Sequence, residues 1–168
     1  MKESTTYLRP HYLDASAMVK LVVDEEYSDR VRSYVLAPSQ SWRLCTSYCF
    51  FESLNVLKAK TNRKELSDRG YIAGSRSLIR LVINSVIKLV HLDVLSTSGF
   101  AEGERLVKLH KIDFIDAFQV ISIKNSWPQL AHPSRPLLVT ADSGLSKAAE
   151  KEDIQVWFCR ETKRPKLM

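Results

Sequence analysis

Short apolar runs alternate with helix-like segments along this chain, and this alternation limits the possible folds more than any other feature. Runs typical of strands occur at 9–13, 44–46, 86–92, 137–140 and 154–158. The segments between them space their apolar residues as amphipathic helices do. Strands that are joined through helices pair in parallel, and the helices pack against the sheet. We therefore predict an α/β fold in which a parallel sheet of four to five strands carries helices on both faces.

The helical segments and loops follow from the same pattern. Ser16 is the expected N-cap of the first helix, and prolines predict loops at 37–39 and 128–136. The spacing of apolar residues predicts helices at 16–23, 27–35, 48–60, 65–83, 96–110, 114–125 and 143–152.

Length and composition fit one globular domain. The chain has 168 residues, of which 45% are hydrophobic and 26% are charged, so we expect residues 1–168 to form a single domain. The most apolar region is interrupted by Arg80, Asn84 and Lys88. Such interruptions argue against a membrane span.

The three cysteines predict neither a disulfide framework nor a zinc ribbon. They stand at 45, 49 and 159, an odd number without a CxxC pair. A reducing, cytoplasmic setting is the simplest interpretation. Cys45 and Cys49 lie one helical turn apart, and we interpret them as packing residues.

The chain is basic, with a formal net charge of +6. A basic tail begins at about residue 160. Either this charge belongs to a solvated surface and tail, or it attracts a polyanion such as RNA. The basic residues of the tail are Arg160, Lys163, Arg164 and Lys166.

Four acidic residues differ from the solvated charges of the chain. Asp14 and Asp142 each follow directly on a predicted strand, at the sheet edge where such folds bind ligands. Glu52 and Asp116 lie in segments that are otherwise largely apolar, where a charge without a partner is costly. Taken singly, each acid also has a structural explanation. The two aspartates after strands can be helix N-caps, and the glutamate can pair with a buried arginine.

Taken together, the four acids predict a carboxylate cluster that binds metal. Carboxylates close together repel one another in a low dielectric unless they take up protons or bind a cation. Oxygen ligands favour Mg²⁺ or Mn²⁺ over zinc. Two such ions can activate a water and stabilise a leaving oxygen. We therefore predict a Mg²⁺ or Mn²⁺ site formed by Asp14, Glu52, Asp116 and Asp142.

Four motifs surround these acids in a definite order. They are YLDASAMVKLVV, TSYCFFESLNVL, FIDAFQVISI and LLVTADSGLSKAA. In order and spacing, over about residues 9–158, the set resembles the PIN domain ribonucleases, and within them the VapC-type toxins of toxin–antitoxin pairs. The first motif looks like the family's opening strand and aspartate, and the second like its glutamate-bearing helix. The third resembles its Asp-Ala pair, and the fourth its strand ending in Thr-x-Asp.

The resemblance implies a metal-dependent endoribonuclease in which a metal-bound water attacks the phosphorus. Its catalytic metal ligands would be Asp14, Glu52, Asp116 and Asp142. The implied partners are an RNA substrate, a small antitoxin protein and a second copy of the chain in a homodimer, with no membrane.

The resemblance also implies supporting residues around the acids. Ser16 would orient Asp14 or a metal-bound water, and Thr140 would support Asp142. Asp113, one helical turn before Asp116, competes for the role of Asp116. We assign that role to Asp116 because it forms the Asp-Ala pair, and we expect Asp113 to bind outer-shell water. The residues before the first strand, the basic tail and the loop at 126–136 depart from the family pattern.

Two other functions fit parts of the sequence. A strand followed by Asp14 also begins phosphohydrolases that form an aspartyl-phosphate, although these usually carry a second acid two residues later, where this chain has Ser16. A PIN-like fold can also be a non-catalytic module that binds RNA or protein. The complete set of acids argues against that reading, because a pure binder has no need of clustered carboxylates.

Overall fold

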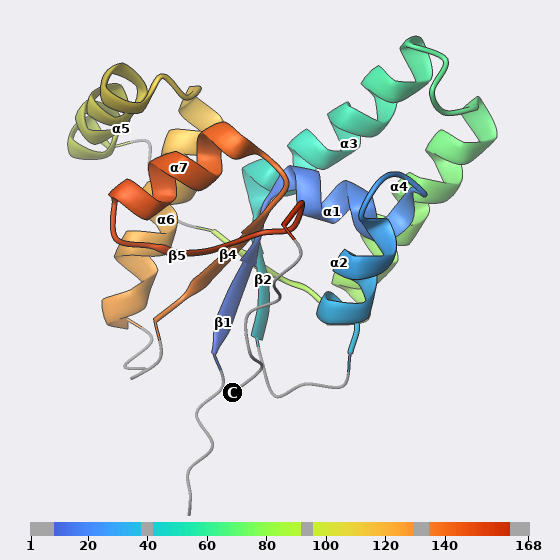
Figure 1. Cartoon of the computed structure of the whole chain (residues 1–168), viewed down its shortest axis with the longest axis horizontal. Helices are drawn as coiled ribbons and strands as arrows, with labels where there is room; N and C mark the ends of the chain where they lie inside the picture. Colours follow the sequence, from blue (N-terminus) through green and yellow to red (C-terminus); the bar gives the residue numbers. More distant parts are fainter. Residues whose placement is uncertain (1–8, 38–41, 92–95, 130–134, 162–168) are drawn as a thin grey trace, which may run out of the picture.

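The structure is a computed structural model that describes residues 9–37, 42–91, 96–129 and 135–161, with backbone only at 127–129. Its five strands form one sheet in the order β3-β2-β1-β4-β5, and every neighbouring pair is parallel (Figure 1). The strands are β1 (Pro10–Leu13), β2 (Trp42–Thr46), β3 (Lys88–Val90), β4 (Leu137–Thr140) and β5 (Gln155–Phe158).

Seven helices in the described part of the chain cover the two faces of this sheet. The first four lie on one side of the strands and the last three on the other (Figure 1). They are α1 (Ala15–Val22), α2 (Ser28–Val35), α3 (Ser47–Asn62), α4 (Asp68–Ile83), α5 (Thr97–His110), α6 (Phe114–Gln129) and α7 (Ser143–Lys151).

The side chains of each strand alternate between two separate cores. Leu13 and Cys45 pack with α1–α4 on one face, whereas Tyr12 and Leu44 pack with α5–α7 on the other. All four residues are buried. Alternation follows from the two-residue period of a strand, and burial on both faces explains why these strands are apolar throughout. The predicted fold class is therefore confirmed, and the architecture is consistent with a PIN-like fold.

The order of the strands places a switch point beside β1. From β1 the chain proceeds outward to β2 and β3, and it then returns to place β4 on the other side of β1. Leu13 is opposite Val139 in the register, and the backbone N–H of Asp14 donates to the carbonyl of Val139 at 3.1 Å. The carboxyl ends of β1 and β4 therefore adjoin, and ligands of open parallel sheets bind in the crevice at such a point.

Several predicted boundaries were wrong by a few residues. The N-cap of α1 is Asp14, and Ser16 lies inside the helix. Helix α4 begins only at Asp68, because the Ser67 side chain caps it. Helix α6 continues to Gln129, so the first part of the predicted loop at 126–136 is helical.

Parts of other predictions fall outside the described residues. These are most of the loop at 37–39, the stretch 130–134, the residues before position 9 and the tail from 162. Within the described part, no helix combines the length and the apolar character needed to cross a bilayer.

Candidate metal centre

Asp14 lies at the centre of the site, directly after β1. Its side chain is 4% exposed. Its Oδ2 atom accepts hydrogen bonds from the Ser16 hydroxyl at 2.5 Å, the Thr140 hydroxyl at 2.9 Å and the Ser16 backbone N–H at 3.2 Å. Burial raises the pKa of Asp14, and these hydrogen bonds oppose the rise because they favour the charged form. The carboxylate is thus fixed in orientation by one of its two oxygens.

Thr140 and Ser16 join the ends of β1 and β4. The Thr140 hydroxyl accepts from the backbone N–H of Asp142 at 2.9 Å while it donates to Asp14. The Ser16 hydroxyl accepts from the backbone N–H of Ala141 at 2.8 Å. Both hydroxyls therefore orient acidic residues, which is the kind of support that the resemblance implied for Ser16 and Thr140. Thr140 contacts both aspartates rather than Asp142 alone.

Asp142 is exposed and begins α7. Its Oδ1 atom accepts from the backbone N–H groups of Gly144 and Leu145 at 2.6 and 2.8 Å, so it is the N-cap of this helix. Asp14 caps α1 in the same way. The structural explanation that the sequence allowed for these aspartates is therefore correct, and it does not exclude metal binding. In each carboxylate the capping bonds use one oxygen and leave the other for a cation.

Glu52 extends toward this cluster from α3 and is half-buried. Its Oε2 atom is buried and has no hydrogen-bond partner among the described residues. The buried arginine that could have paired with it is not found among them. Desolvation, followed by repulsion from Asp14, Asp113 and Asp142, raises the pKa of Glu52 to about 7. A buried carboxylate oxygen without a donor is costly unless it is protonated or bound to a cation.

Asp116 comes from the first turn of α6 and completes the group. Burial is the largest cause that raises the pKa of Asp116, and repulsion from Asp14 and Asp113 is the next. With smaller contributions from Asp142 and Glu52, the pKa reaches about 8. Asp113 is exposed and accepts from the backbone N–H of Asp116 at 2.9 Å. Asp113 therefore caps α6, whereas Asp116 is the more buried of the two.

The charges of the four acids that the sequence singled out act on one another. Repulsion from Asp14 and Asp142 raises the pKa of Glu52, and repulsion from Asp14, Asp142 and Glu52 raises the pKa of Asp116. Without a cation, protons must neutralise part of this charge near neutral pH. Mg²⁺ and Mn²⁺ bind carboxylate oxygens and retain some of their water ligands. The donor set therefore fits a hard divalent cation.

The sequence interpretation missed two residues behind the acids. Cys49 and Gln119 are buried, and the Cys49 thiol donates to Gln119 Oε1 at 2.7 Å. The Thr46 hydroxyl donates to the same oxygen at 3.0 Å. This small network connects β2, α3 and α6, and Cys49 and Gln119 lie about one helical turn from Glu52 and Asp116, respectively. Spacing along the sequence could not show that Gln119 faces Cys49.

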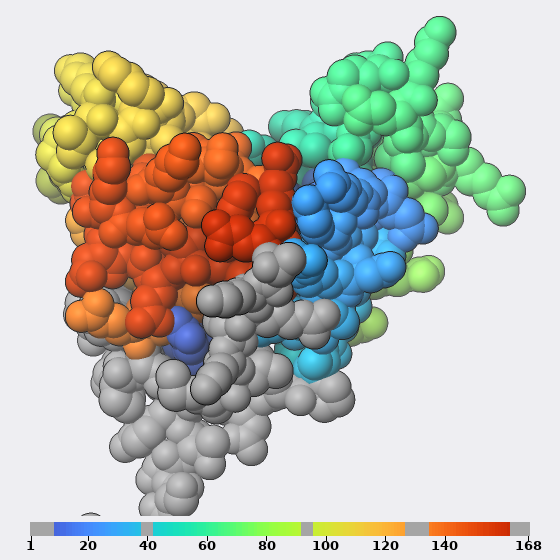
Figure 2. All heavy atoms as spheres, viewed as in Figure 1, coloured from blue at the N-terminus to red at the C-terminus, as the bar shows by residue number. Residues whose placement is uncertain are grey.

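The surface above the carboxyl edge of the sheet is notched. Figure 2 shows the notch between the helices α5–α7 and an arm formed by α3 and α4 (residues 47–83, the α3–α4 arm), on the side toward which β1 runs in Figure 1. This arm carries seven basic and three acidic residues. A basic arm beside an acidic site is suited to a polyanionic ligand.

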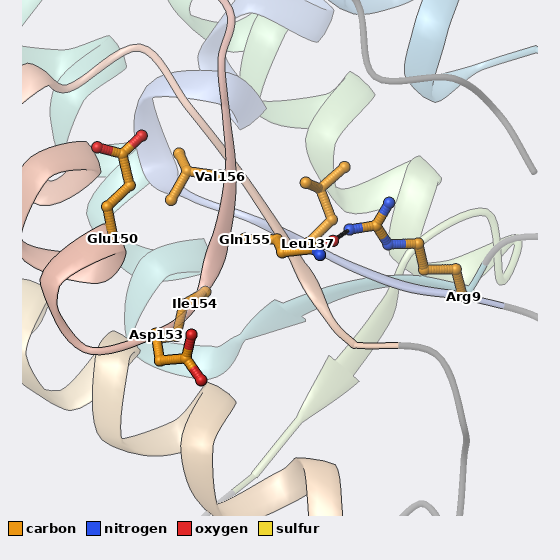
Figure 3. Close-up of a pocket in the computed structure, with 7 residues that line it drawn as sticks. All are labelled: Arg9, Leu137, Glu150, Asp153, Ile154, Gln155 and Val156. Carbon is orange, nitrogen blue, oxygen red and sulfur yellow. Dashed lines mark hydrogen bonds between the residues drawn. The ribbon is translucent and has the colours of Figure 1, made fainter.

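A second hollow lies at the opposite edge of the sheet. Arg9, Glu150 and Asp153 line it together with the starts of β4 and β5 (Figure 3). Arg9 donates to the Gln155 side chain and to the carbonyl of Arg135. This second hollow has charged groups of both signs and is lined by none of the four acids, so it is not part of the candidate centre.

Comparison with known proteins supports the fold and leaves the family unassigned. No protein-family model and no curated protein matches the chain. Among solved structures, the chain is similar to the crystal structure of PAE2754 from Pyrobaculum aerophilum, with a TM-score of 0.56 and 18% identity over 83% of this chain and 84% of that one. At this identity the similarity shows a shared α/β architecture only.

Proposed function

We propose that this protein is a metal-dependent endoribonuclease that uses Mg²⁺ or Mn²⁺ held by Asp14, Glu52, Asp116 and Asp142. The observation that carries the proposal is the buried, unpartnered Oε2 of Glu52, beside acids whose charges raise the pKa of both Glu52 and Asp116. A divalent cation would both bind the unpartnered oxygen and neutralise the repulsion between the acids. The motif order described above and the position at the β1–β4 switch point add support.

In this mechanism the protein's own groups position the reactants. When bound, the metal would supply an activated water and stabilise the departing oxygen of the phosphodiester. Asp14 is held by Ser16 and Thr140 in one orientation. The basic α3–α4 arm would hold the RNA backbone beside the acids.

An aspartyl-phosphate mechanism has less support from the same geometry. Asp14 would have to attack phosphorus, yet it is almost fully buried and three donors engage its Oδ2. The position two residues later is Ser16, which donates to Asp14 instead of acting as an acid. Release of phosphate from a small phosphomonoester would distinguish this mechanism from RNA cleavage.

The resemblance to VapC-type toxins motivates a narrower proposal. In this role the chain would act in the cytoplasm, form a homodimer and be neutralised by a small antitoxin that covers the acidic notch. The free, buried state of Cys45, Cys49 and Cys159 suits a reducing compartment. Growth arrest on expression, relieved by the product of a neighbouring gene, would support the toxin role. Normal growth at high expression would argue against it.

The test of the ribonuclease proposal is the variant Asp14→Asn. The substitution keeps the size of the side chain and removes the charge. We expect loss of Mg²⁺- or Mn²⁺-dependent RNA cleavage with the fold retained. Asp24→Asn, at a carboxylate that is 93% exposed, is the matched control and should cleave like the parent. Cleavage by Asp14→Asn at the parental rate would show that the assigned mechanism is wrong.

A further inference from the structure

A thiol lies beside two of the acids in the candidate centre. One oxygen of Asp14, one oxygen of Glu52 and the Cys49 sulfur all lie within 4.8 Å of one another. Cys49 and Glu52 are three residues apart in α3, so they share one face of that helix. Asp14 approaches from the end of β1. Within the described residues this is the one group of three metal-ligating side chains found at such distances.

The thiol is held in place by a second buried polar group. Gln119 is fully buried, and its Oε1 accepts from Cys49, while its Nε2 has no partner among the described residues. Leaving a buried amide donor unpaired costs free energy. A hydrophobic side chain would fill this space without that cost. The polar site therefore extends behind the carboxylates as far as Gln119, and Cys49 lies between the two.

We propose that Asp14, Cys49 and Glu52 bind Zn²⁺ or a softer divalent cation through two carboxylates and one thiolate, in competition with Mg²⁺. This inference shares Asp14 and Glu52 with the proposed ribonuclease, but the metal binding that it describes does not depend on that function. Magnesium does not use sulfur ligands, whereas zinc binds thiolate and carboxylate together. Cys49 would then determine which metals occupy the centre.

The geometry requires at most a small contraction of the site. Zinc binds sulfur at about 2.3 Å and carboxylate oxygen at about 2.0–2.2 Å, so its ligand atoms lie about 3.4–3.6 Å apart in a tetrahedral site. Rotation of the half-buried Glu52 side chain can provide the movement of about 1 Å, because its Oε2 has no bond to break. A water molecule would complete the tetrahedron.

Binding exchanges a proton for the cation. The S–H bond of Cys49 breaks, the sulfur–zinc bond forms, and the proton leaves to solvent. The hydrogen bond from the thiol to Gln119 is lost. In the metal-free protein, burial and the charges of Asp14 and Glu52 raise the pKa of the Cys49 thiol. A bound dication reverses the local field, and a coordinated thiol is deprotonated outright.

The test is titration of the metal-free protein with Cd²⁺ as a probe, followed through the ultraviolet charge-transfer absorbance of a cadmium–thiolate bond. We expect saturation at one equivalent and competition by excess Mg²⁺. Cys49→Ser should abolish the band, and the matched variant Cys159→Ser should keep it. Absence of a band in the parent protein, or an unchanged band in Cys49→Ser, would overturn the proposal.

A second variant tests the site independently if Cys49→Ser does not fold. Asp14→Asn keeps the thiol, and it should weaken Cd²⁺ binding by about tenfold or more, since a ligand is lost. An unaltered affinity would show that the thiol binds cadmium without the carboxylates, which contradicts the proposed site. Because no RNA is present, this result is separate from the nuclease assay. Either proposal can fail while the other stands.

Discussion

The variant Asp116→Asn should make the metal-free protein more stable at alkaline pH. Folding raises the pKa of Asp116 from 3.8 to about 8, so the folded protein binds a proton that the unfolded chain releases. The contribution of Asp116 to the stability of the metal-free parent is therefore most favourable at low pH, becomes less favourable as the pH rises from about 4, and is fully unfavourable above about 8. Asparagine cannot ionise, so the variant does not lose stability in this way as the pH rises.

The magnitude follows from the same pKa change. Each pKa unit corresponds to about 1.4 kcal/mol, which gives an upper limit of about 5–6 kcal/mol. Water at the rim of the site and the sharing of repulsion among several acids reduce the expected gain to about 2 kcal/mol. We expect this gain at about pH 9 in the presence of a chelator, and almost none at about pH 4.

Urea denaturation at the two pH values, with chelator and with Mg²⁺, measures this effect. Bound metal stabilises the parent by about 2.7 kcal/mol at a hundredfold excess over the dissociation constant. Magnesium should therefore remove or reverse the advantage of Asp116→Asn. The exposed control Asp68→Asn should change stability by no more than about 0.5 kcal/mol. If Asp116→Asn were less stable than the parent at alkaline pH with chelator, the proposed crowding of charge would be refuted.

Two further predictions concern Thr140 in the site and the ion pairs that Glu152 forms with α5 and α6. Thr140→Val removes the donor to Asp14 and the acceptor of the Asp142 N–H. It should cost about 1–3 kcal/mol in urea denaturation and weaken Mn²⁺ binding measured by calorimetry, whereas undiminished Mn²⁺ affinity would remove Thr140 from the support of the site. Glu152 accepts from Lys124 and Arg105, and these partners, with His110, hold the pKa of Glu152 at about 2. Glu152→Gln should therefore lower stability by about 1 kcal/mol at neutral pH, with a difference that fades as the pH falls from about 4.5 toward 2, and a difference independent of pH would contradict this.

The sequence predicted the sheet and the four acids because both depend on local patterns. An apolar run that ends in an aspartate marks the end of a strand, and this local pattern does not depend on which helices pack against the strand. Parallel pairing then places Asp14 and Asp142 at one edge. The isolated charges of Glu52 and Asp116 stood out for a similar reason, since each interrupts an apolar helix. Their proximity in the structure follows from α3 and α6 packing beside the same switch point.

Other features depend on contacts that spacing does not encode. The bond between Cys49 and Gln119 joins residues 70 positions apart, and it exists because α6 packs against α3. Cys49 was therefore interpreted as a packing residue. The cap of α1 was ambiguous locally, because Asp14 and Ser16 are both good caps. Pro128 predicted a break in α6, yet a proline near the end of a helix disrupts few hydrogen bonds, and the helix continues to Gln129.

The most direct test of the central claim is anomalous diffraction from a crystal soaked with Mn²⁺. The account predicts a manganese peak bounded by the carboxylates of Asp14, Glu52, Asp116 and Asp142, with the unpaired oxygen of Glu52 among its ligands. A fully soaked crystal with no peak between these side chains, or with manganese bound only elsewhere, would contradict it.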